Sequence, residues 1–304
     1  MILLNLPEEL VRIIFLQWIE LKEMGKLDSA LCKDRSLRTL MLKYMCGNNI
    51  AYSLTPTFIT ELTTVNQIMD KFLVWCSRRN IITDTIMLTE KIERKTYENK
   101  VLDKIGHCAR TLIICNLPEF NIRHESVYYK LVHYVVEKCP RIEKIHCELC
   151  LNSNESLKNS FEFRMGYFIR GCPNLQEISV PCLSILNLER LAYHCKRIRS
   201  ITISSSTVLQ WTAQEVQKSV SNWPELENWS VPVSVPIDFG SYCPQLRELL
   251  VSLECYPWDL VKNLAIGCPN LEHIDLSTRN ESAVQLTKLL CRFSQLKYIY
   301  MCLN

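Results

Sequence analysis

Glycine is scarce in this sequence, with only 7 among 304 residues, whereas ordinary proteins use about 7% glycine. Loops that hold phosphate groups with their backbone amides need several closely spaced glycines. The isolated glycines of this chain therefore exclude a nucleotide-binding loop of that kind. The six histidines also stand apart from any signature that combines a nucleophile with a base. We therefore expect a chain that is not an enzyme and needs no cofactor.

A strong excess of one charge is missing too. The chain has 35 Lys and Arg against 32 Asp and Glu, a net charge of +3, and its basic residues are scattered. Proteins that bind nucleic acid usually gather basic residues into a patch or stripe, so we expect no nucleic-acid partner. The longest stretch without a charge covers residues 44–60. Its Gly, Pro and Asn residues make it too polar to span a membrane, so we expect no membrane partner either.

The N-terminus lacks the features of a secretory signal. Pro7, Glu8 and Glu9 interrupt the apolar start, and no basic region precedes it. A cleavage site of small residues is also missing. We therefore expect an intracellular protein, cytoplasmic, nuclear or both, whose cysteines stay reduced.

Cysteine, by contrast, is abundant, with 16 residues, and its spacing indicates a repeat with the motif C-P-x-L-x-x-L-x-L. The copies, two of which replace Cys with an aromatic residue, begin at Cys108, Cys139, Cys172, Cys195, Trp223, Cys243, Cys268 and Phe293. Their spacing of 20 to 33 residues brackets the period of roughly 20–29 residues that is typical of leucine-rich repeats. Each unit reads as a strand, a loop and a helix that ends at the next Cys-Pro, because proline cannot continue a helix.

Residues that cap helices mark several of the expected helix starts. Thr212 and Glu215 have the spacing of a capping box. Asn187 is placed to cap a helix that runs from Leu188 to Cys195. The sequence therefore predicts an α/β fold, a right-handed leucine-rich-repeat solenoid (horseshoe).

The cysteines need no metal or redox chemistry in this interpretation. Cys147 and Cys150 form a CxxC motif close to His146 and Cys139, but both fall at consensus positions of the repeat. A second CxxC that could complete a zinc site is missing. Small thiols buried where helix meets strand explain the repeat cysteines by packing. We expect no metal site.

The Cys-Pro before the strand leucines resembles the cysteine-containing leucine-rich repeat that is associated with F-box proteins. Residues 4–42 differ in texture from the repeats. Pro7 and two acidic residues open an expected helix whose Leu10, Ile13, Ile14 and Trp18 share one face. This start resembles an F-box.

The resemblance implies a partner, because F-boxes dock onto a Skp-type adaptor that links them to the core of a cullin-RING ubiquitin ligase. By resemblance, the docking residues are Leu6, Pro7, Leu10, Ile13, Ile14 and Leu31. Many F-boxes carry a Trp shortly after the Cys of their second helix, whereas Cys32 is followed here by Lys33 and Asp34. The alternative is that residues 1–42 are a helical cap on the open end of the solenoid.

Strand residues that alternate with the leucine-type positions are expected to line the concave face of the solenoid. The candidate partner-binding residues among them are Lys144, His146, Glu148, Glu177, Glu248, His273, Asp275, Tyr298 and Tyr300. We prefer the two tyrosines, because tyrosine combines a large contact area with a polar tip. The last repeat stops at its strand, so we also expect this end to be frayed, paired with another chain, or the product of a shortened gene.

These features predict three parts of the chain: an F-box-like helical segment at 1–42, an irregular linker or degenerate first repeat at 43–100, and the leucine-rich-repeat domain at 101–304. The predicted function is that of a substrate-recognition adaptor of a Skp-cullin-F-box type E3 ubiquitin ligase, whose repeats bind a protein substrate. The alternative is a leucine-rich-repeat scaffold or inhibitor that binds a protein and has no link to a ligase.

Overall fold

The structure is a computed structural model of the whole chain. It describes residues 26–28, 30–36, 38–39, 42, 51–52, 82–88, 102, 106–115, 125–148, 155–204, 211–232, 235–251, 258–278 and 291–303. The chain forms two compact units, residues 1–141 and 142–304, which are described separately. The predicted boundaries after residues 42 and 100 both fall within the first unit, and they stay predictions.

The described part of the first unit contains two pairs of parallel strands. These pairs are β1 (Ala51–Tyr52) with β2 (Ile82–Thr83), and β3 (Thr85–Leu88) with β4 (Thr111–Cys115). It also contains the 3-10 helices η2 (Leu31–Lys33) and η4 (Gly106–Cys108), the α-helix α8 (Glu125–Lys138), and further helical residues at 26–28, 30, 35–36, 38–39, 42 and 102. The amides of Arg110 and Thr111 both donate to the carbonyl of Asp84, at 2.7 and 2.9 Å. This pair of bonds fixes the start of β4 against the start of β3.

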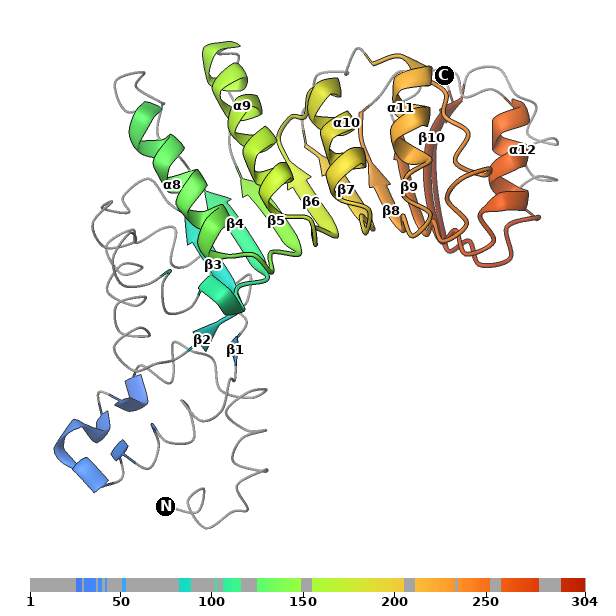
Figure 1. Cartoon of the computed structure of the whole chain (residues 1–304). Coiled ribbons are helices and arrows are strands. Elements are labelled where there is room, and N and C mark those ends of the chain that lie inside the picture. Colours follow the sequence, from blue (N-terminus) through green and yellow to red (C-terminus); the bar gives the residue numbers. More distant parts are fainter. Residues whose placement is uncertain are drawn as a thin grey trace. The chain divides into compact units, whose positions relative to one another are not determined.

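The second unit is a parallel sheet whose strands alternate with helices along the chain (Figure 1). The strands are β5 (Lys144–Glu148), β6 (Glu177–Val180), β7 (Ser200–Ile203), β8 (Asn228–Ser230), β9 (Glu248–Val251), β10 (His273–Thr278) and β11 (Tyr298–Leu303). The helices are α9 (Glu155–Gly171), α10 (Ile185–His194), α11 (Ala213–Val220) and α12 (Trp258–Gly267). Every neighbouring pair from β5 to β11 is parallel and in chain order. The predicted α/β class and the parallel, repeating architecture are confirmed.

The repeat motif forms a tight turn between helix and strand. The amide of Cys268 makes the last helical hydrogen bond of α12 by donating to the carbonyl of Leu264 at 2.9 Å. The amide of Leu271 then donates to the carbonyl of Cys268 at 3.2 Å and closes the turn. The same closing bond joins Leu175 to Cys172 and Leu246 to Cys243. Proline suits the second position of such a turn because its φ angle is already set to the required value. The Cys-Pro pair therefore ends one element and aims the chain into the next strand.

From Cys139 to Phe293 the first residue of each motif is buried, and at Cys195 and Cys268 its thiol bonds to the repeat before it. The thiol of Cys195 donates to the carbonyls of Ile169 and Cys172, both at 3.4 Å. Cys268 donates in the same way to the carbonyl of Cys243 at 3.3 Å. The carbonyls of Cys172 and Cys243 also accept from the amides of Leu175 and Leu246, so each thiol adds a second donor to a buried carbonyl that has two lone pairs.

Trp223 takes the place of a cysteine in this series. Its indole Nε1 donates to the carbonyl of Cys195 at 2.9 Å, and its own carbonyl lies 3.9 Å from the Cys243 Sγ. Although tryptophan and cysteine differ greatly in size, both bring a donor to the same carbonyl. The hydrogen-bonded series therefore continues through this repeat.

The prediction that each repeat contains a helix is wrong between β8 and β9. The described residues of this segment, 231–232 and 235–242, form no helix, and Ile237 and Phe239 fill the core instead. Only 20 residues separate the motif at Trp223 from that at Cys243, and two prolines, Pro232 and Pro236, lie between them. Proline and the short spacing together favour an extended connection. The side chain of Gln217 on α11 bonds to the backbone of residue 238 and fastens this segment.

Helix caps agree with the sequence at one predicted position and differ at another. Thr212 and Glu215 form the predicted capping box at the start of α11. For α10, the cap is Ser184, whose side chain accepts from the amide of Asn187. Asn187 is not the cap but lies one turn inside the helix, buried, where its Nδ2 donates to the carbonyl and the carboxylate of Glu162 on α9.

Two of the scarce glycines lie where neighbouring repeats approach most closely. A Cβ atom on Gly267, at the end of α12, would lie 1.8 Å from the carbonyl oxygen of Gly240. A Cβ atom on Gly240 would lie 2.2 Å from the carbonyl oxygen of Asn263. Any side chain at either position would collide with backbone, so these two glycines are required by packing.

Crossing a membrane requires a helix that is both long and apolar. Within the described part of the chain, no helix meets both requirements.

Candidate protein-binding surface

One face of the second unit is made by strand side chains that alternate with core residues. The described core positions of neighbouring strands, from Ile145 to Ile274, are at most 5% exposed. The side chains between them point to the other face, and they are exposed or half-buried. We call this other face the strand face. It consists of one row at 144, 177, 200, 228, 248, 273 and 298, and a second row at 146, 179, 202, 230, 250, 275 and 300.

The register brings most of the predicted partner-binding residues into these two rows. The first row holds Lys144, Glu177, Glu248, His273 and Tyr298, and the second row holds His146, Asp275 and Tyr300. Glu148 ends β5, and the structure does not describe its side chain. Whether these residues bind a partner stays a prediction.

At the β5 end of the strand face, charges of opposite sign meet. The Nζ of Lys144 lies 2.6 Å from a carboxylate oxygen of Glu177, with both side chains about half exposed. An exposed pair of this kind contributes only about 0–1 kcal/mol to stability. Its value on this surface is therefore to present two charges at fixed positions.

At the β11 end, the strand face becomes aromatic. The rings of His273 and Tyr298 stack with their centroids 4.7 Å apart, and the Tyr298 side chain is 64% exposed. Asp275, in the second row of β10, is half-buried, and this burial raises the pKa of its carboxyl group above the usual value. Leu250 in the neighbouring strand is half-buried too. This end therefore combines aromatic, apolar and acidic groups, which is a composition suited to a protein partner.

A ladder of backbone bonds runs along the edge of the sheet where the strands begin. The residue before each strand and the first residue of that strand both donate to the carbonyl of the residue before the previous strand. We call the residues that precede the strands the edge row: Glu143, Gln176, Arg199, Glu227, Arg247, Glu272 and Lys297. From Arg199 onward their charges alternate in sign. Lys297 pairs with Glu272 at 2.6 Å, and Arg199 lies 3.9 Å from Glu227.

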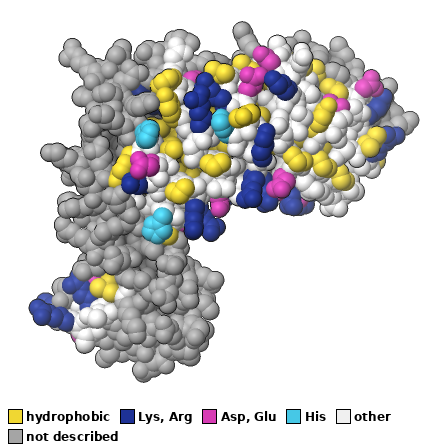
Figure 2. Space-filling model, in the orientation of Figure 1, with side chains coloured by type: hydrophobic (Ala, Val, Ile, Leu, Met, Phe, Trp, Pro, Cys, Tyr) yellow, Lys and Arg dark blue, Asp and Glu magenta, His cyan; other side chains and the backbone are white. Residues whose placement is uncertain are grey.

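Figure 2 shows that charges of both signs are interspersed on the visible face, with small apolar areas between them. On this face the described residues form no broad area of a single charge. Mixed charge of this kind allows specific pairing with a protein surface.

The repeat cysteines are poor nucleophiles because they are buried. Burial raises the pKa of the Cys139 and Cys195 thiols to about 12, and only the thiolate form of cysteine is a strong nucleophile. His194 precedes Cys195 in sequence, but its ring packs edge-on against Tyr193 while the thiol bonds to backbone carbonyls. These two residues therefore do not form a nucleophile and base pair. The described part of the chain also contains no cluster of three His, Cys, Asp or Glu side chains that could hold a metal ion.

Most of the predicted adaptor-binding residues lie outside the described residues, namely Leu6, Pro7, Leu10, Ile13 and Ile14. Leu31 is described, and it lies half-buried in η2. Near it, Arg38 forms two hydrogen bonds to the carboxylate of Asp28, at 2.7 and 3.1 Å. Asp28 is almost completely buried, so this ion pair ties residues 28 and 38 together beside η2.

Sequence reasoning missed a hollow on the helix side of the second unit, between α10 and α11. It includes Lys196, which stands where the repeat motif has proline. That departure from Cys-Pro was the available signal, because a residue that breaks a repeat needs a reason other than the repeat.

Comparisons with known proteins do not assign this chain to a family. The sequence matches no protein-family model and no curated protein. Among solved structures, it is similar to a chain in the crystal structure of the Rad7 and Elc1 complex in yeast, with a TM-score of 0.39 and 12% identity. The similarity covers 91% of this chain and 84% of that chain.

Proposed function

We propose that this chain is the substrate-recognition adaptor of a Skp-cullin-F-box type E3 ubiquitin ligase. In this proposal, the F-box-like residues 1–42 bind a Skp-type adaptor, and the strand face of the right-handed leucine-rich-repeat domain holds a protein substrate. The chain performs no chemistry itself, because ubiquitin transfer is carried out by partner subunits. It works in the cytoplasm, the nucleus or both.

The observation that carries the substrate-binding part is the strand face. From β5 to β10, every second described side chain of the parallel strands is buried, and the others lie side by side in two rows that the register continues onto β11. These rows run from the Lys144 and Glu177 pair to the stacked rings of His273 and Tyr298. A continuous surface with charged groups at one end and aromatic groups at the other supports recognition of an extended protein segment.

The adaptor-binding part is supported by sequence. Leu6 and Pro7, followed by Leu10, Ile13 and Ile14 at helical spacing, resemble the docking helix of an F-box. Leu31 belongs to the same proposed surface. The joining of such a start to cysteine-containing repeats is more specific than either feature alone.

Co-purification tests the link to the ligase. The full chain is expressed with a Skp-type adaptor, and its affinity-purified complex is compared with that of the double variant Leu10→Asp plus Ile14→Asp. We expect the wild type to recover adaptor and the double variant to lose it, because two buried carboxylates cannot be accommodated in an apolar interface. A Tyr298→Ala variant is the matched control, and we expect it to keep the adaptor.

One observation favours a second function, that of a repeat scaffold or inhibitor without a ligase. The segment after Cys32 carries no Trp, and Asp34 there accepts hydrogen bonds from the amide and the hydroxyl of Ser36. If the wild-type chain recovers no adaptor, the ligase function is rejected. Loss of a captured protein partner in the Tyr298→Ala variant would then support the scaffold.

A further inference from the structure

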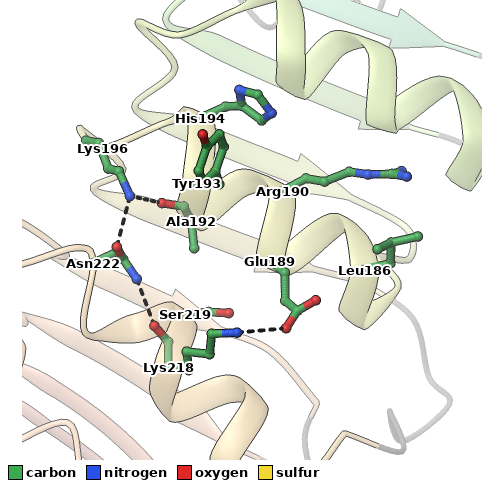
Figure 3. A pocket seen from close by; sticks show the side chains of 10 residues that line it. All are labelled: Leu186, Glu189, Arg190, Ala192, Tyr193, His194, Lys196, Lys218, Ser219 and Asn222. Atoms are coloured by element: carbon green, nitrogen blue, oxygen red, sulfur yellow. Dashed lines mark hydrogen bonds and ion pairs between the residues drawn. The ribbon is translucent and has the colours of Figure 1, made fainter.

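The hollow between α10 and α11 has a volume of about 390 Å³ and opens to solvent on the helix side of the second unit. Its walls come from α10, from α11 and from the turns that follow them (Figure 3). This volume is within the range of pockets that hold ligands, about 300–1,000 Å³. It is large enough to take at least one bulky side chain.

Two cations at the hollow have only neutral partners within the described part of the chain. Lys196 donates to the carbonyl of Ala192 and, at 2.9 Å, to the Oδ1 of Asn222. Arg190 donates to the Oδ1 of Asn187 at 3.0 Å. The rim thus carries two positive charges that no described carboxylate compensates.

A third cation at the hollow, unlike Arg190 and Lys196, has a carboxylate partner. Lys218 of α11 lies 3.5 Å from the carboxylate of Glu189 on α10, so its charge is balanced (Figure 3). The titration of His194 agrees with an excess of positive charge. Its pKa is lowered, first by burial and then by the nearby charges of Arg170, Arg190 and Lys196. The hollow therefore attracts negative charge.

The walls of the hollow also include two exposed apolar side chains. Leu186 is 52% exposed and Tyr193 is 75% exposed. The Tyr193 ring is positioned from two sides, since the His194 ring packs edge-on at 4.8 Å and the Lys196 ammonium lies 6.0 Å from its centroid. A positioned aromatic ring and a leucine two turns away on the same helix (Figure 3) are suitable contacts for an apolar side chain of a bound segment. A simple inorganic anion would leave these two side chains unused.

Lys196 is not required by the repeat in which it lies. Proline follows the first motif residue in five other copies, as Pro140, Pro173, Pro224, Pro244 and Pro269. The turn therefore accepts proline at this position, and its lysine adds a positive charge, whose ammonium also donates to Ala192 and Asn222. The charge is placed next to Tyr193, where it both positions the ring and faces the hollow.

We propose that this hollow binds an acidic peptide segment of a protein partner. An apolar side chain of the segment lies between Leu186 and Tyr193, and flanking carboxylates pair with Arg190 and Lys196. The site lies on the helices and does not use the strand face, so it is independent of the function proposed above.

Fluorescence polarisation tests the proposal with a defined probe, a short fluorescein-labelled peptide in which one Phe is flanked on both sides by Glu and Asp. We expect the full chain to bind it, and added salt to weaken binding because the partly exposed charges are screened. The double variant Arg190→Gln plus Lys196→Pro is expected to bind about ten-fold more weakly, since it removes two charge pairs. Lys196→Pro restores the repeat motif, so this substitution is expected to leave the fold intact by circular dichroism.

A matched pair of variants tests the apolar contact. Tyr193 and Ile266 occupy the same position in their repeats, two residues before the motif cysteine, and both are exposed. We expect Tyr193→Ala to weaken binding about five-fold, because stacked aromatic contacts add to the buried area, and Ile266→Ala to leave binding unchanged. A probe with Ser in place of Phe is expected to bind as weakly as the Tyr193→Ala variant binds the original probe.

Four results would overturn the proposal. The first is a wild-type chain that does not bind the acidic probe, and the second is one that binds a probe with Lys in place of every acidic residue equally well. The double variant could keep wild-type affinity while correctly folded. Finally, equal effects of Tyr193→Ala and Ile266→Ala would reduce the interaction to unspecific attraction between charges.

Discussion

The indole nitrogen of Trp223 donates to the backbone carbonyl of Cys195 at 2.9 Å, the bond that a cysteine thiol makes in neighbouring repeats. Cys195 itself donates to the carbonyl of Cys172, and Cys268 donates to that of Cys243. From Cys195 to Cys268, the first position of the motif therefore keeps a buried side chain with a hydrogen-bond donor. The chemistry of sulfur is not needed there.

A comparison of two buried tryptophans measures how much this hydrogen bond contributes to stability. Trp223 and Trp229 are both fully buried, but within the described part of the chain the Nε1 of Trp229 has no hydrogen-bond partner. We expect Trp223→Phe to lower the free energy of unfolding by about 1–2 kcal/mol more than Trp229→Phe does, because it leaves a buried carbonyl without its donor. Urea denaturation followed by circular dichroism measures both. Equal losses would show that the bond contributes nothing beyond the size of the ring.

Thiol labelling is expected to separate the cysteines by burial. Cys291 is exposed, whereas Cys139, Cys195 and Cys268 are buried with pKa values raised to about 12. Iodoacetamide at pH 8 is expected to modify Cys291 first, and the three buried thiols only after unfolding. Mass spectrometry of the labelled peptides, with and without denaturant, measures the order. Early modification of Cys195 in the native protein would contradict its place in the hydrogen-bonded series.

The same buried thiols predict a loss of stability in alkali. Their pKa is raised from 9.0 to about 12 by burial, so between these values the unfolded chain loses protons that the folded chain keeps. Their contribution to stability is complete below pH 9 and is lost as the pH rises toward 12. We expect the free energy of unfolding to fall over this range. Since lysine and tyrosine titrate there too, the measurement is a comparison with the Cys268→Ala variant, whose slope is expected to be smaller.

Substitution by alanine is expected to affect stability differently at two glycines. Gly267→Ala puts a methyl group into the backbone of Gly240, which cannot move away, and we expect a loss of about 3 kcal/mol. Gly166→Ala meets first the end of the Arg190 side chain, at 2.7 Å, which is flexible. Because alanine also favours the helix over glycine, we expect a change of less than about 1 kcal/mol. Thermal unfolding of both variants checks the contrast, and a mild effect at Gly267 would show that neighbouring repeats can separate there.

A buried and an exposed ion pair are expected to contribute differently to stability. Arg38 pairs with the buried Asp28, and Lys144 pairs with the exposed Glu177. We expect Arg38→Met to destabilise its surroundings by about 2 kcal/mol, because it leaves a buried carboxylate without its charged donor. Lys144→Met is expected to cost less than about 1 kcal/mol. Hydrogen exchange around residues 28 and 38, and around residues 144 and 177, measures each effect locally.

The sequence predicted the parts of the fold that are encoded locally. The spacing of the motif placed the strands of the second unit, because each strand starts five residues after the motif residue, as Glu177 does after Cys172. Because successive side chains of a strand point to opposite faces, the motif also predicted which side chains face the core. The capping box at Thr212 was predictable for the same reason, since it involves only residues within one helical turn.

What could not be predicted depends on contacts between repeats. Asn187 has the chemistry of a helix cap, but the approach of α9 draws it into a buried bond with Glu162, and Ser184 caps the helix. The segment around Phe239 forms no helix, because its repeat is short and packs an extended chain against Trp229. The hollow beside Lys196 is formed by residues of two repeats, and no pattern within one repeat describes it.

The alternating charges of the edge row limit the number of repeats that related chains can gain or lose. From Arg199 to Lys297 the signs run positive, negative, positive, negative, positive, on strands that lie about 5 Å apart. Gain or loss of one repeat within this stretch would place two like charges side by side, whereas gain or loss of two repeats would keep the alternation. Relatives of this chain are therefore expected to differ here by even numbers of repeats.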